Sequence, residues 1–406
     1  MPWQEVKPMD EKVKFIADYL RGDLAFKALC GLYGISRKTG YKWVQRYRAQ
    51  GIDGLQERSR RPHAPAVTPY IVREAVLKFR NYKGDVLGAK KIQPLLLAQF
   101  GEAQTPSQTT IYNILKSAGC VKSRSRVART VRSIKPLKVA NQANQLWSVD
   151  YKGQFKLGNG QWCYPLTVMD HASRYLLSCE GLCNTTTADA KAVFERLFRE
   201  YGLPERIRSD NGCPFASVGV GGLSKLAIWW IRLGIIPERI TPGQPQQNGR
   251  HERMHRTLKQ RIGAVGAADL VQQQMRLDEF RQHYNEGRLH EGLGQQVPSS
   301  AYAKSTRSYP EQLPELVYPD YFERGRVCQS GLIYWRSLRV YIGYLLRDEW
   351  IGLELVDEGI WDVYFGPVRL GSLDEREVKG AKNDYLRLFN IKSVTHVGEV
   401  MCNLCS

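Results

Sequence analysis

Apolar residues recur every three or four positions near the start of the chain, a spacing that places them on one face of a helix. The residues with this spacing are Leu24, Ala28, Leu29 and Leu32. Gly34 then offers a turn, and Ser36 stands where its side chain can cap a following helix. We therefore predict a helix-turn-helix unit in residues 1–57.

A second helical unit is expected in residues 66–121, after a segment rich in Arg and Pro. Residues 71–79 and 89–100 have helical spacing, and the segment 105–116 supplies a cap and a third helix. This order of helices indicates a second helix-turn-helix domain, of the winged type.

From residue 141 the pattern changes to short apolar runs rich in β-branched and aromatic residues, which indicate strands. The expected strands are 145–150, 163–169, 175–182 and 206–210. Residues 157–160 offer a tight turn between the first two strands. The expected helices are 188–201, capped by Thr185 or Thr186, and 270–284. Together these elements predict an α/β domain in residues 141–305.

Residues 318–375 have a third kind of pattern, in which Tyr, Val, Ile and Trp alternate between Gly turns. Such alternation predicts a small all-β barrel, which we place at 315–376. The tail, 377–406, has no pattern from which we predict an element. The chain is therefore expected to be a multidomain protein.

The distribution of charge along the chain indicates which kind of molecule it binds. The 406 residues carry a formal net charge of +19, and residues 1–140 alone hold 27 basic and 10 acidic residues. A basic region of this kind is typical of nucleic-acid binding, with affinity that comes largely from phosphate contacts. The segment 122–140 is expected to be a basic linker, because seven of its residues are basic and none is acidic.

Candidate DNA contacts lie on the second predicted helix and in the two basic segments. A basic helix after the turn is a candidate for the major groove, although a purely structural helical hairpin is the alternative. The candidates are Arg37, Lys38, Lys42, Arg46, Arg60, Arg61, Arg124 and Arg126.

Three acidic residues lie at strand ends or at a helix start. Asp150 ends the first expected strand, Asp210 ends a later one before an Asn-Gly turn, and Glu252 follows a Gly-containing loop that opens a helix. A hard cation takes carboxylate oxygens, and two such ions activate the attacking oxygen and stabilise the leaving one in phosphodiester cleavage. These residues are therefore candidate ligands for two ions of Mg²⁺ or Mn²⁺.

The segments Ser-Val-Asp at 148–150, Ser-Asp-Asn-Gly at 209–212 and Pro-Gln-Gln-Asn-Gly at 245–249, with Glu252, resemble the catalytic core of retroviral-type integrases and bacterial insertion-sequence transposases. The resemblance covers roughly residues 145–305. It implies an RNase H-like fold, a catalytic triad of Asp150, Asp210 and Glu252, and a position near DNA for Lys259. Residues 215–224 depart from the family pattern as an insertion whose role stays open.

Two local alternatives compete with this interpretation. His251 and His255 flank Glu252 in a His-Glu-x-x-His pattern, which could place two imidazoles around zinc as in a metalloprotease. Packing of these imidazoles, or contact with phosphate, is the other interpretation. Asp170 is a competing carboxylate, but its place in a turn favours contact with Ser173 or Arg174.

We expect a DNA transposase that binds transposon ends and cleaves a phosphodiester; transfer of the freed 3′ hydroxyl to target DNA follows from the resemblance, as does a homomultimer. A domesticated DNA-binding regulator and a nuclease without strand transfer are the alternatives. Scattered cysteines and the lack of a long apolar run predict an intracellular protein with no membrane contact. The resemblance implies a bacterial, cytoplasmic and nucleoid-associated location.

Overall fold

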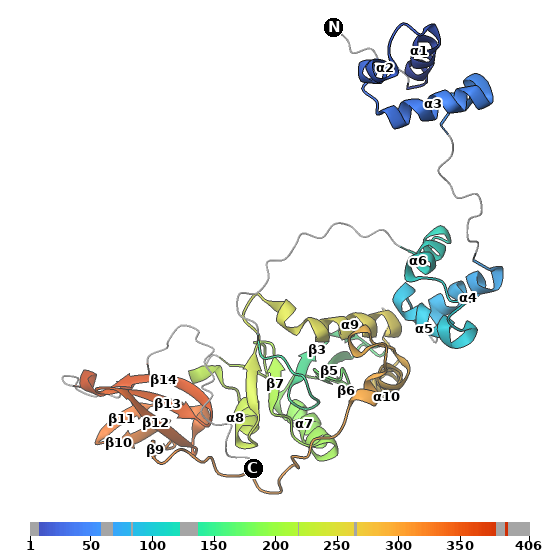
Figure 1. Cartoon of the computed structure of the whole chain (residues 1–406). Helices are drawn as coiled ribbons and strands as arrows, with labels where there is room; N and C mark the ends of the chain where they lie inside the picture. The colour runs from blue at the N-terminus through green and yellow to red at the C-terminus, as the bar shows by residue number, and fades with distance from the viewer. Residues whose placement is uncertain are drawn as a thin grey trace. The chain divides into compact units, whose positions relative to one another are not determined.

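The computed structural model describes residues 8–57, 68–82, 84–121, 137–217, 219–263, 266–378 and 386–388. Four of the predicted DNA contacts, Arg60, Arg61, Arg124 and Arg126, lie outside the described residues. Contacts along the backbone divide the chain into two units, residues 1–69 and 70–406 (Figure 1).

The first unit is a bundle of three helices. They are α1 (Pro8–Arg21), α2 (Phe26–Leu32) and α3 (Arg37–Gln50), followed by the short 3-10 helix η1 (Gly51–Leu55). The Ser36 side chain accepts a hydrogen bond from the Thr39 N–H, and Gly34 has a φ of 62°, so the predicted cap and turn are confirmed. The helix-turn-helix prediction therefore holds for the described part of this unit.

The core of this unit differs from the predicted apolar stripe. Leu29 is buried, but Leu24 and Leu32 have exposed fractions of 49% and 70%. The reason is that α2 begins only at Phe26, so its buried face falls on Leu29 and Cys30. The buried core consists of Phe15, Ile16, Leu29, Cys30, Trp43, Val44 and Leu55.

The second unit begins with a small helical domain. Its elements are α4 (Tyr70–Arg80), β1 (Asn81–Tyr82), β2 (Asp85–Val86), α5 (Ala89–Phe100) and α6 (Gln108–Ser117). Ser107 caps α6 by accepting from the Thr110 N–H, and Ile111, Ile114 and Leu115 are buried. The three predicted helices are confirmed.

A mixed six-stranded sheet forms the centre of this unit (Figure 1). Its strands are β3 (Trp147–Tyr151), β4 (Phe155–Lys156), β5 (Trp162–Asp170), β6 (Leu176–Leu182), β7 (Arg206–Ser209) and β8 (Ile236–Arg239). The antiparallel strands β3, β5 and β6 correspond to the predicted ones, while β7 and β8 run parallel to β3. We did not predict β8.

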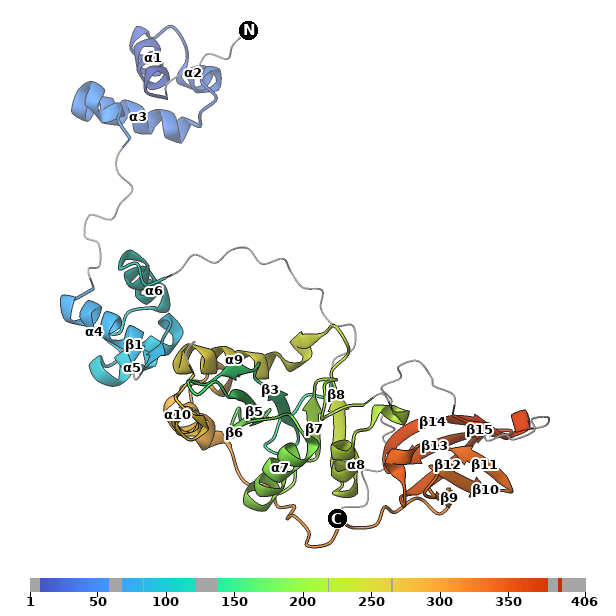
Figure 2. The same cartoon turned by 180° about the vertical axis from the view of Figure 1, so that it is seen from behind.

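Helices cover both faces of this sheet (Figure 2). On one face pack α7 (Thr187–Tyr201), capped by Thr186, and α8 (Lys225–Arg232). On the other pack α9 (Gly249–Ile262) and α10 (Leu270–Gln282). The connecting short elements are η2 (Val220–Gly222), η3 (Pro245–Asn248), the π-helical η4 (His283–Gly287), η5 (Glu291–Leu293) and α11 (Pro298–Ala301).

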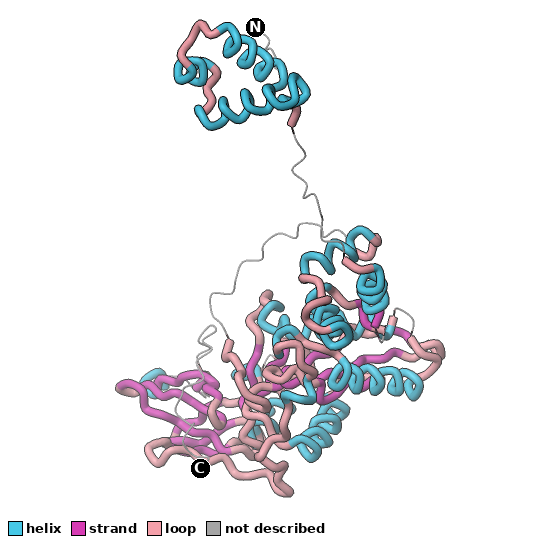
Figure 3. Tube along the Cα trace, turned by 45° about the vertical axis from the view of Figure 1, so that its right-hand side comes forward, coloured by secondary structure: helices cyan, strands magenta, loops and turns pink. Residues whose placement is uncertain are grey.

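The regular elements of the remaining described residues are mostly strands (Figure 3). One sheet has the order β14-β13-β12-β9, and another has the order β10-β11-β15. The elements are β9 (Glu323–Arg326), β10 (Leu332–Trp335), β11 (Leu338–Tyr341), η6 (Tyr344–Leu346), β12 (Trp350–Asp357), β13 (Ile360–Phe365), β14 (Val368–Asp374), η7 (Glu375–Val378) and β15 (Leu386–Arg387). The all-β prediction is confirmed, but a closed barrel is not, because the strand pairing forms two separate sheets.

Candidate active site

Asp150 and Asp210 lie at the same edge of the central sheet. Asp150 is the fourth residue of β3, and Asp210 directly follows β7, which pairs with β3 in parallel. The carboxyl ends of parallel neighbouring strands share one edge, so this topology brings the two carboxylates toward each other. Glu252 lies on the exposed side of the first turn of α9, a helix that contacts β3 and packs against β5 and β6.

The other two carboxylates both act on Asp150 electrostatically. Burial, followed by the negative charges of Asp210 and Glu252, raises the pKa of the Asp150 carboxyl to about 7. A divalent cation would offset this repulsion, and an all-oxygen donor set suits Mg²⁺. Among the described residues, no three His, Cys, Asp or Glu side chains are gathered tightly enough to enclose a metal ion. Three carboxylates supply the kind of oxygen ligand that Mg²⁺ takes, and Mg²⁺ usually keeps water or phosphate oxygens as its further ligands.

The Asn-Gly turn after β7 holds Asp210. Asp210 Oδ1 accepts a hydrogen bond of 3.0 Å from the Gly212 N–H, and Asn211 Nδ2 donates to the Ile240 carbonyl at 2.8 Å. A Cβ atom on residue 212 would lie 3.0 Å from Asp210 Oδ2, so a side chain there would crowd the carboxylate. A residue larger than glycine at this position would therefore require the Asp210 carboxylate to shift by a few tenths of an ångström.

His251 and His255 pack beneath the carboxylates on the buried face of α9. His251 Nδ1 lies 2.9 Å from Ser148 Oγ, and both Nε2 atoms lie 2.7 Å from Thr167 Oγ1. Burial lowers the pKa of His255 to about 3 and that of His251 well below its usual value, so both are neutral. Both nitrogens of His251 face hydroxyl groups, which argues against the predicted alternative of a zinc pair and favours packing.

Arg208 stabilises the edge of the sheet at which Asp150 and Asp210 lie. Its guanidinium is almost fully buried, pairs with Glu238 at 2.5 Å and donates to the Gln247 and Lys138 carbonyls at 3.1 and 2.8 Å. It therefore connects β7, β8 and the loop before α9. Arg208 and the His251 cluster were missed by the sequence analysis, because only the pairing of strands shows which side chains meet.

Asp170 has a structural role. Its Oδ1 accepts from the backbone and the hydroxyl of Ser173 at 2.8 and 2.6 Å, and its Oδ2 accepts from the Asn144 N–H at 2.8 Å. The carboxylate is fully buried and shapes the turn after β5. The predicted contact with Ser173 is confirmed.

Basic residues lie on exposed faces of α3 and α9. On α3, Arg37 and Lys38 are exposed in the first turn, where the helix dipole disfavours cations. Lys42 and Arg46 lie over the Trp43 ring, with the charged atom 4.3 and 5.1 Å from its centroid. On α9 the exposed residues are Arg253, Arg256 and Lys259, on the same helix as Glu252.

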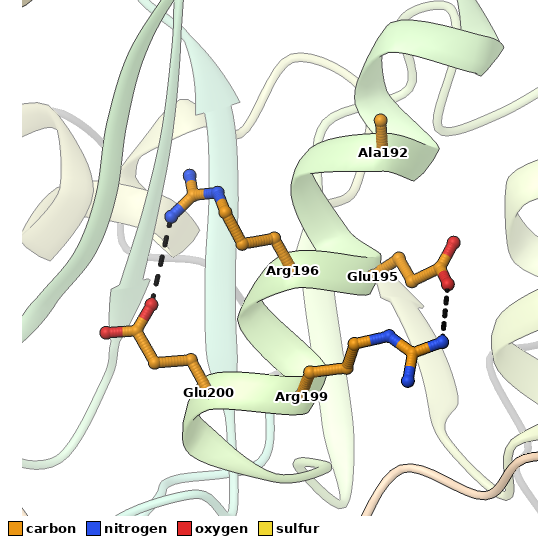
Figure 4. A pocket seen from close by; sticks show the side chains of 5 residues that line it. All are labelled: Ala192, Glu195, Arg196, Arg199 and Glu200. Atoms are coloured by element: carbon orange, nitrogen blue, oxygen red, sulfur yellow. Dashed lines mark hydrogen bonds and ion pairs between the residues drawn. The ribbon is translucent and has the colours of Figure 1, made fainter.

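A surface hollow of about 540 Å³ lies elsewhere, over α7 (Figure 4). Its side chains pair with each other along the helix, Arg199 with Glu195 at 2.9 Å and Arg196 with Glu200 at 3.8 Å. None of them belongs to the carboxylate edge. This hollow is therefore not part of the candidate site.

Comparison with known proteins gives the class of this chain. The integrase core domain family matches residues 140–245 and 233–298, which include β3, β7 and α9. A helix-turn-helix domain family matches residues 11–63, and a homeodomain-like family matches 39–115. The chain is thus an integrase-core protein with helix-turn-helix domains.

Its curated relatives come from insertion elements and retroviruses. It is 27% identical over 214 residues to the uncharacterized 31.7 kDa protein of insertion element IS407 from Burkholderia multivorans, covering 51% of this chain and 74% of that protein. It is 24% identical over 282 residues to the uncharacterized 39.2 kDa protein of insertion element IS476 from Xanthomonas euvesicatoria, covering 68% and 77%. The chain is therefore similar to insertion-element proteins and, in its central region, matches the integrase core domain.

Solved structures with partial likeness include two retroviral proteins. The simian T-cell lymphotropic virus intasome has 15% identity and a TM-score of 0.33, and covers 72% of this chain and 97% of that chain. The HTLV-2 integrase catalytic core with magnesium has 14% identity and a TM-score of 0.29, and covers 42% and 100%. In the part of the chain that the structure describes, no helix has the length and hydrophobicity that a membrane crossing requires.

Proposed function

We propose that this chain is a DNA transposase that cleaves a phosphodiester at transposon ends and transfers the freed 3′ hydroxyl to target DNA. The observation that carries this proposal is that Asp150 and Asp210 lie at the ends of the paired parallel strands β3 and β7, and that the charges of Asp210 and Glu252 both act on Asp150. The matching integrase core domain and the insertion-element relatives support DNA transposition and integration in general.

In this proposal Asp150, Asp210 and Glu252 hold two ions of Mg²⁺ or Mn²⁺. When bound, such ions lower the pKa of an attacking water and stabilise the leaving oxygen. Glu252 is exposed, so DNA can approach it from solvent, and the exposed cations Arg253, Arg256 and Lys259 on the same helix bind its phosphates. The buried network below α9 holds the helix against the sheet while DNA binds.

End recognition is assigned to the helical domains. In the proposed division, residues 1–57 and 66–121 bind DNA, 122–140 link them to the core at 141–305, and 315–376 form the β domain. The N-terminus of α3, with Arg37 and Lys38, is proposed to contact phosphate, because a bound anion offsets the unfavourable position of these cations. To bring two transposon ends together, the protein is proposed to act as a homomultimer on double-stranded DNA.

The test is a strand-transfer assay with labelled end DNA and Mg²⁺, comparing the native chain with Asp150→Asn, Asp210→Asn and Glu252→Gln. We expect each substitution to abolish joined product while end binding is retained. Glu279→Gln on α10 is the matched control, because Glu279 is also an exposed helical glutamate of the same domain. Cleavage without joining would indicate a nuclease, and binding without metal-dependent chemistry would indicate a regulator; either result overturns the proposal.

A further inference from the structure

Four buried side chains beneath α9 form a hydrogen-bond network: Ser148, Thr167, His251 and His255. This network provides no partner for one imidazole nitrogen beside Asp150. Thr167 lies opposite Asp150 in the β3–β5 pairing and its hydroxyl is fully buried. It donates to the Asp150 carbonyl at 2.9 Å and lies 2.7 Å from Nε2 of both His251 and His255. Three polar atoms therefore share one hydroxyl.

The number of protons decides which nitrogens carry hydrogen. A threonine hydroxyl has one hydrogen to donate and two lone pairs to accept with. Because that hydrogen goes to the Asp150 carbonyl, both imidazoles must donate to Thr167 from Nε2. A neutral imidazole has only one N–H, so Nδ1 of each ring carries a lone pair.

The two Nδ1 lone pairs face different groups. Nδ1 of His251 lies 2.9 Å from Ser148 Oγ, whose hydroxyl can donate to it. Nδ1 of His255 lies 3.6 Å from Asp150 Oδ2, an atom that has no proton to give when the carboxylate is ionised. Two electron-rich atoms at this separation repel each other unless a proton on the carboxyl or a metal cation lies between them. When the carboxylate is ionised, a metal cation is what removes this repulsion.

We propose that His255 Nδ1 is a nitrogen ligand to the divalent cation held by Asp150. Metal-binding histidines commonly donate their other ring N–H to a fixed acceptor, which sets the tautomer, and Thr167 is that acceptor here. His251 has no free nitrogen and serves only to anchor α9. The inference rests on the proposed function and deepens it, because it adds a ligand to the same site.

A nitrogen ligand changes the metal preference. Imidazole favours transition ions over Mg²⁺, whereas carboxylate, carbonyl and water suit both Mg²⁺ and Mn²⁺. With His255 present, the full chain should therefore bind Mn²⁺ more tightly than an all-carboxylate site would. Loss of the imidazole should weaken Mn²⁺ binding by at least about tenfold and Mg²⁺ binding by less.

The decisive experiment is electron paramagnetic resonance of Mn²⁺ bound to the full chain without DNA. Natural and ¹⁵N-histidine-labelled protein are compared, so that the presence of a histidine ligand is tested without any substitution, and two variants then identify which histidine it is. We expect a histidine-nitrogen hyperfine coupling that changes with the isotope, disappears in His255→Gln and persists in His251→Gln. Titration with Mn²⁺ and Mg²⁺ on the same proteins measures the change in preference.

The outcomes separate this inference from the proposed function. Mn²⁺ binding that is lost in Asp150→Asn but shows no nitrogen coupling would overturn the role of His255 and leave the carboxylate site standing. A coupling that persists in His255→Gln would also overturn it. If neither Asp150→Asn nor His255→Gln alters Mn²⁺ binding, the proposed metal site itself is wrong.

Discussion

Arg208 shows how one buried side chain can hold the candidate site together. Its guanidinium joins Glu238 on β8, the loop before α9 and the backbone at Lys138. A buried ion pair adds little net stability over an apolar pair, but removal of one partner leaves an uncompensated charge. The contribution of Arg208 is therefore expected to be visible mainly when it is removed alone.

We predict that Arg208→Met lowers the free energy of unfolding by about 3–5 kcal/mol, because Glu238 then stays buried without a partner. Urea unfolding followed by circular dichroism measures the change. The double variant Arg208→Met with Glu238→Met should recover most of the loss. If the single and double variants are equally destabilised, the pair itself is not the cause.

A second prediction concerns pH. Burial lowers the pKa of four imidazoles far below that of a free histidine: His171, His251, His255 and His290. Below pH ~6.5 these histidines are protonated in the unfolded chain but stay neutral in the folded chain. The free energy of unfolding therefore falls by up to about 1.4 kcal/mol per pH unit for each histidine. The raised pKa values of Asp150 and Asp170 act in the opposite direction, since the folded chain takes up those protons first.

Four histidines against two carboxylates leave a net loss of stability as pH falls from 7.5 to 5.5. Urea unfolding at these pH values in the presence of a chelator measures it, and His290→Gln should show a shallower dependence. Constant stability across this range would contradict the lowered pKa values.

At the scale of single residues, the sequence was enough to predict some side-chain contacts and insufficient for others. Ser36, Thr186 and the Asp170–Ser173 contact follow from local spacing, and the structure confirms them. The contacts of Thr167 with His251 and His255 span 84 and 88 residues, and depend on the register of β3 against β5. Local patterns carry no information on such register.

Among the elements, α2 and α3 illustrate how a glycine permits close packing of helices. A Cβ atom on Gly40 would lie 2.7 Å from Cys30 Sγ and 3.0 Å from the Phe26 ring. In contrast, a Cβ atom on Gly31, also in a helix, would meet nothing within 4 Å. Gly40 is therefore a position where an added methyl group would clash, and Gly31 is a helical position that serves as its control.

We predict that Gly40→Ala destabilises the first unit by about 1–3 kcal/mol through overpacking. Gly31→Ala should stabilise it by about 0.5–1 kcal/mol, because alanine restricts the unfolded chain and favours helix. Thermal unfolding of both full-length variants measures the two effects. Equal and small shifts would show that the helices can move apart at little cost.

Helix α8 was not predicted from the sequence, although it has a long apolar run. All six residues from Leu226 to Ile231 are buried, so no polar face marks the helical period. The strand β8 that follows it is short and partly exposed. Periodicity identifies helices that lie at a surface, such as α7, and fails for a helix enclosed on all sides.

At the scale of the whole molecule, charge governs DNA binding. We predict that affinity for duplex DNA falls linearly on a log–log plot against salt, with a slope set by the number of phosphates contacted. Arg37→Gln should reduce this slope by about 1, because Arg37 is proposed to contact a phosphate. Fluorescence anisotropy at 50–200 mM salt measures the slope.

Lys14→Gln is the control for this measurement. Lys14 is exposed on α1 and pairs with Glu11 at 3.2 Å, and its loss changes the net charge by the same amount. An equal change in slope for both variants would mean that net charge alone, and not the start of α3, determines binding.

The burial of α8 on all sides has a consequence for how the protein unfolds. Leu226, Trp229 and Trp230 belong to the core of the central sheet, whereas Ala227, Ile228 and Ile231 belong to the core of the β sheets that follow. Neither core is complete without this helix, so the two should melt as one cooperative transition. A chain that ends before β9 would expose one apolar side of α8 to water and would tend to aggregate.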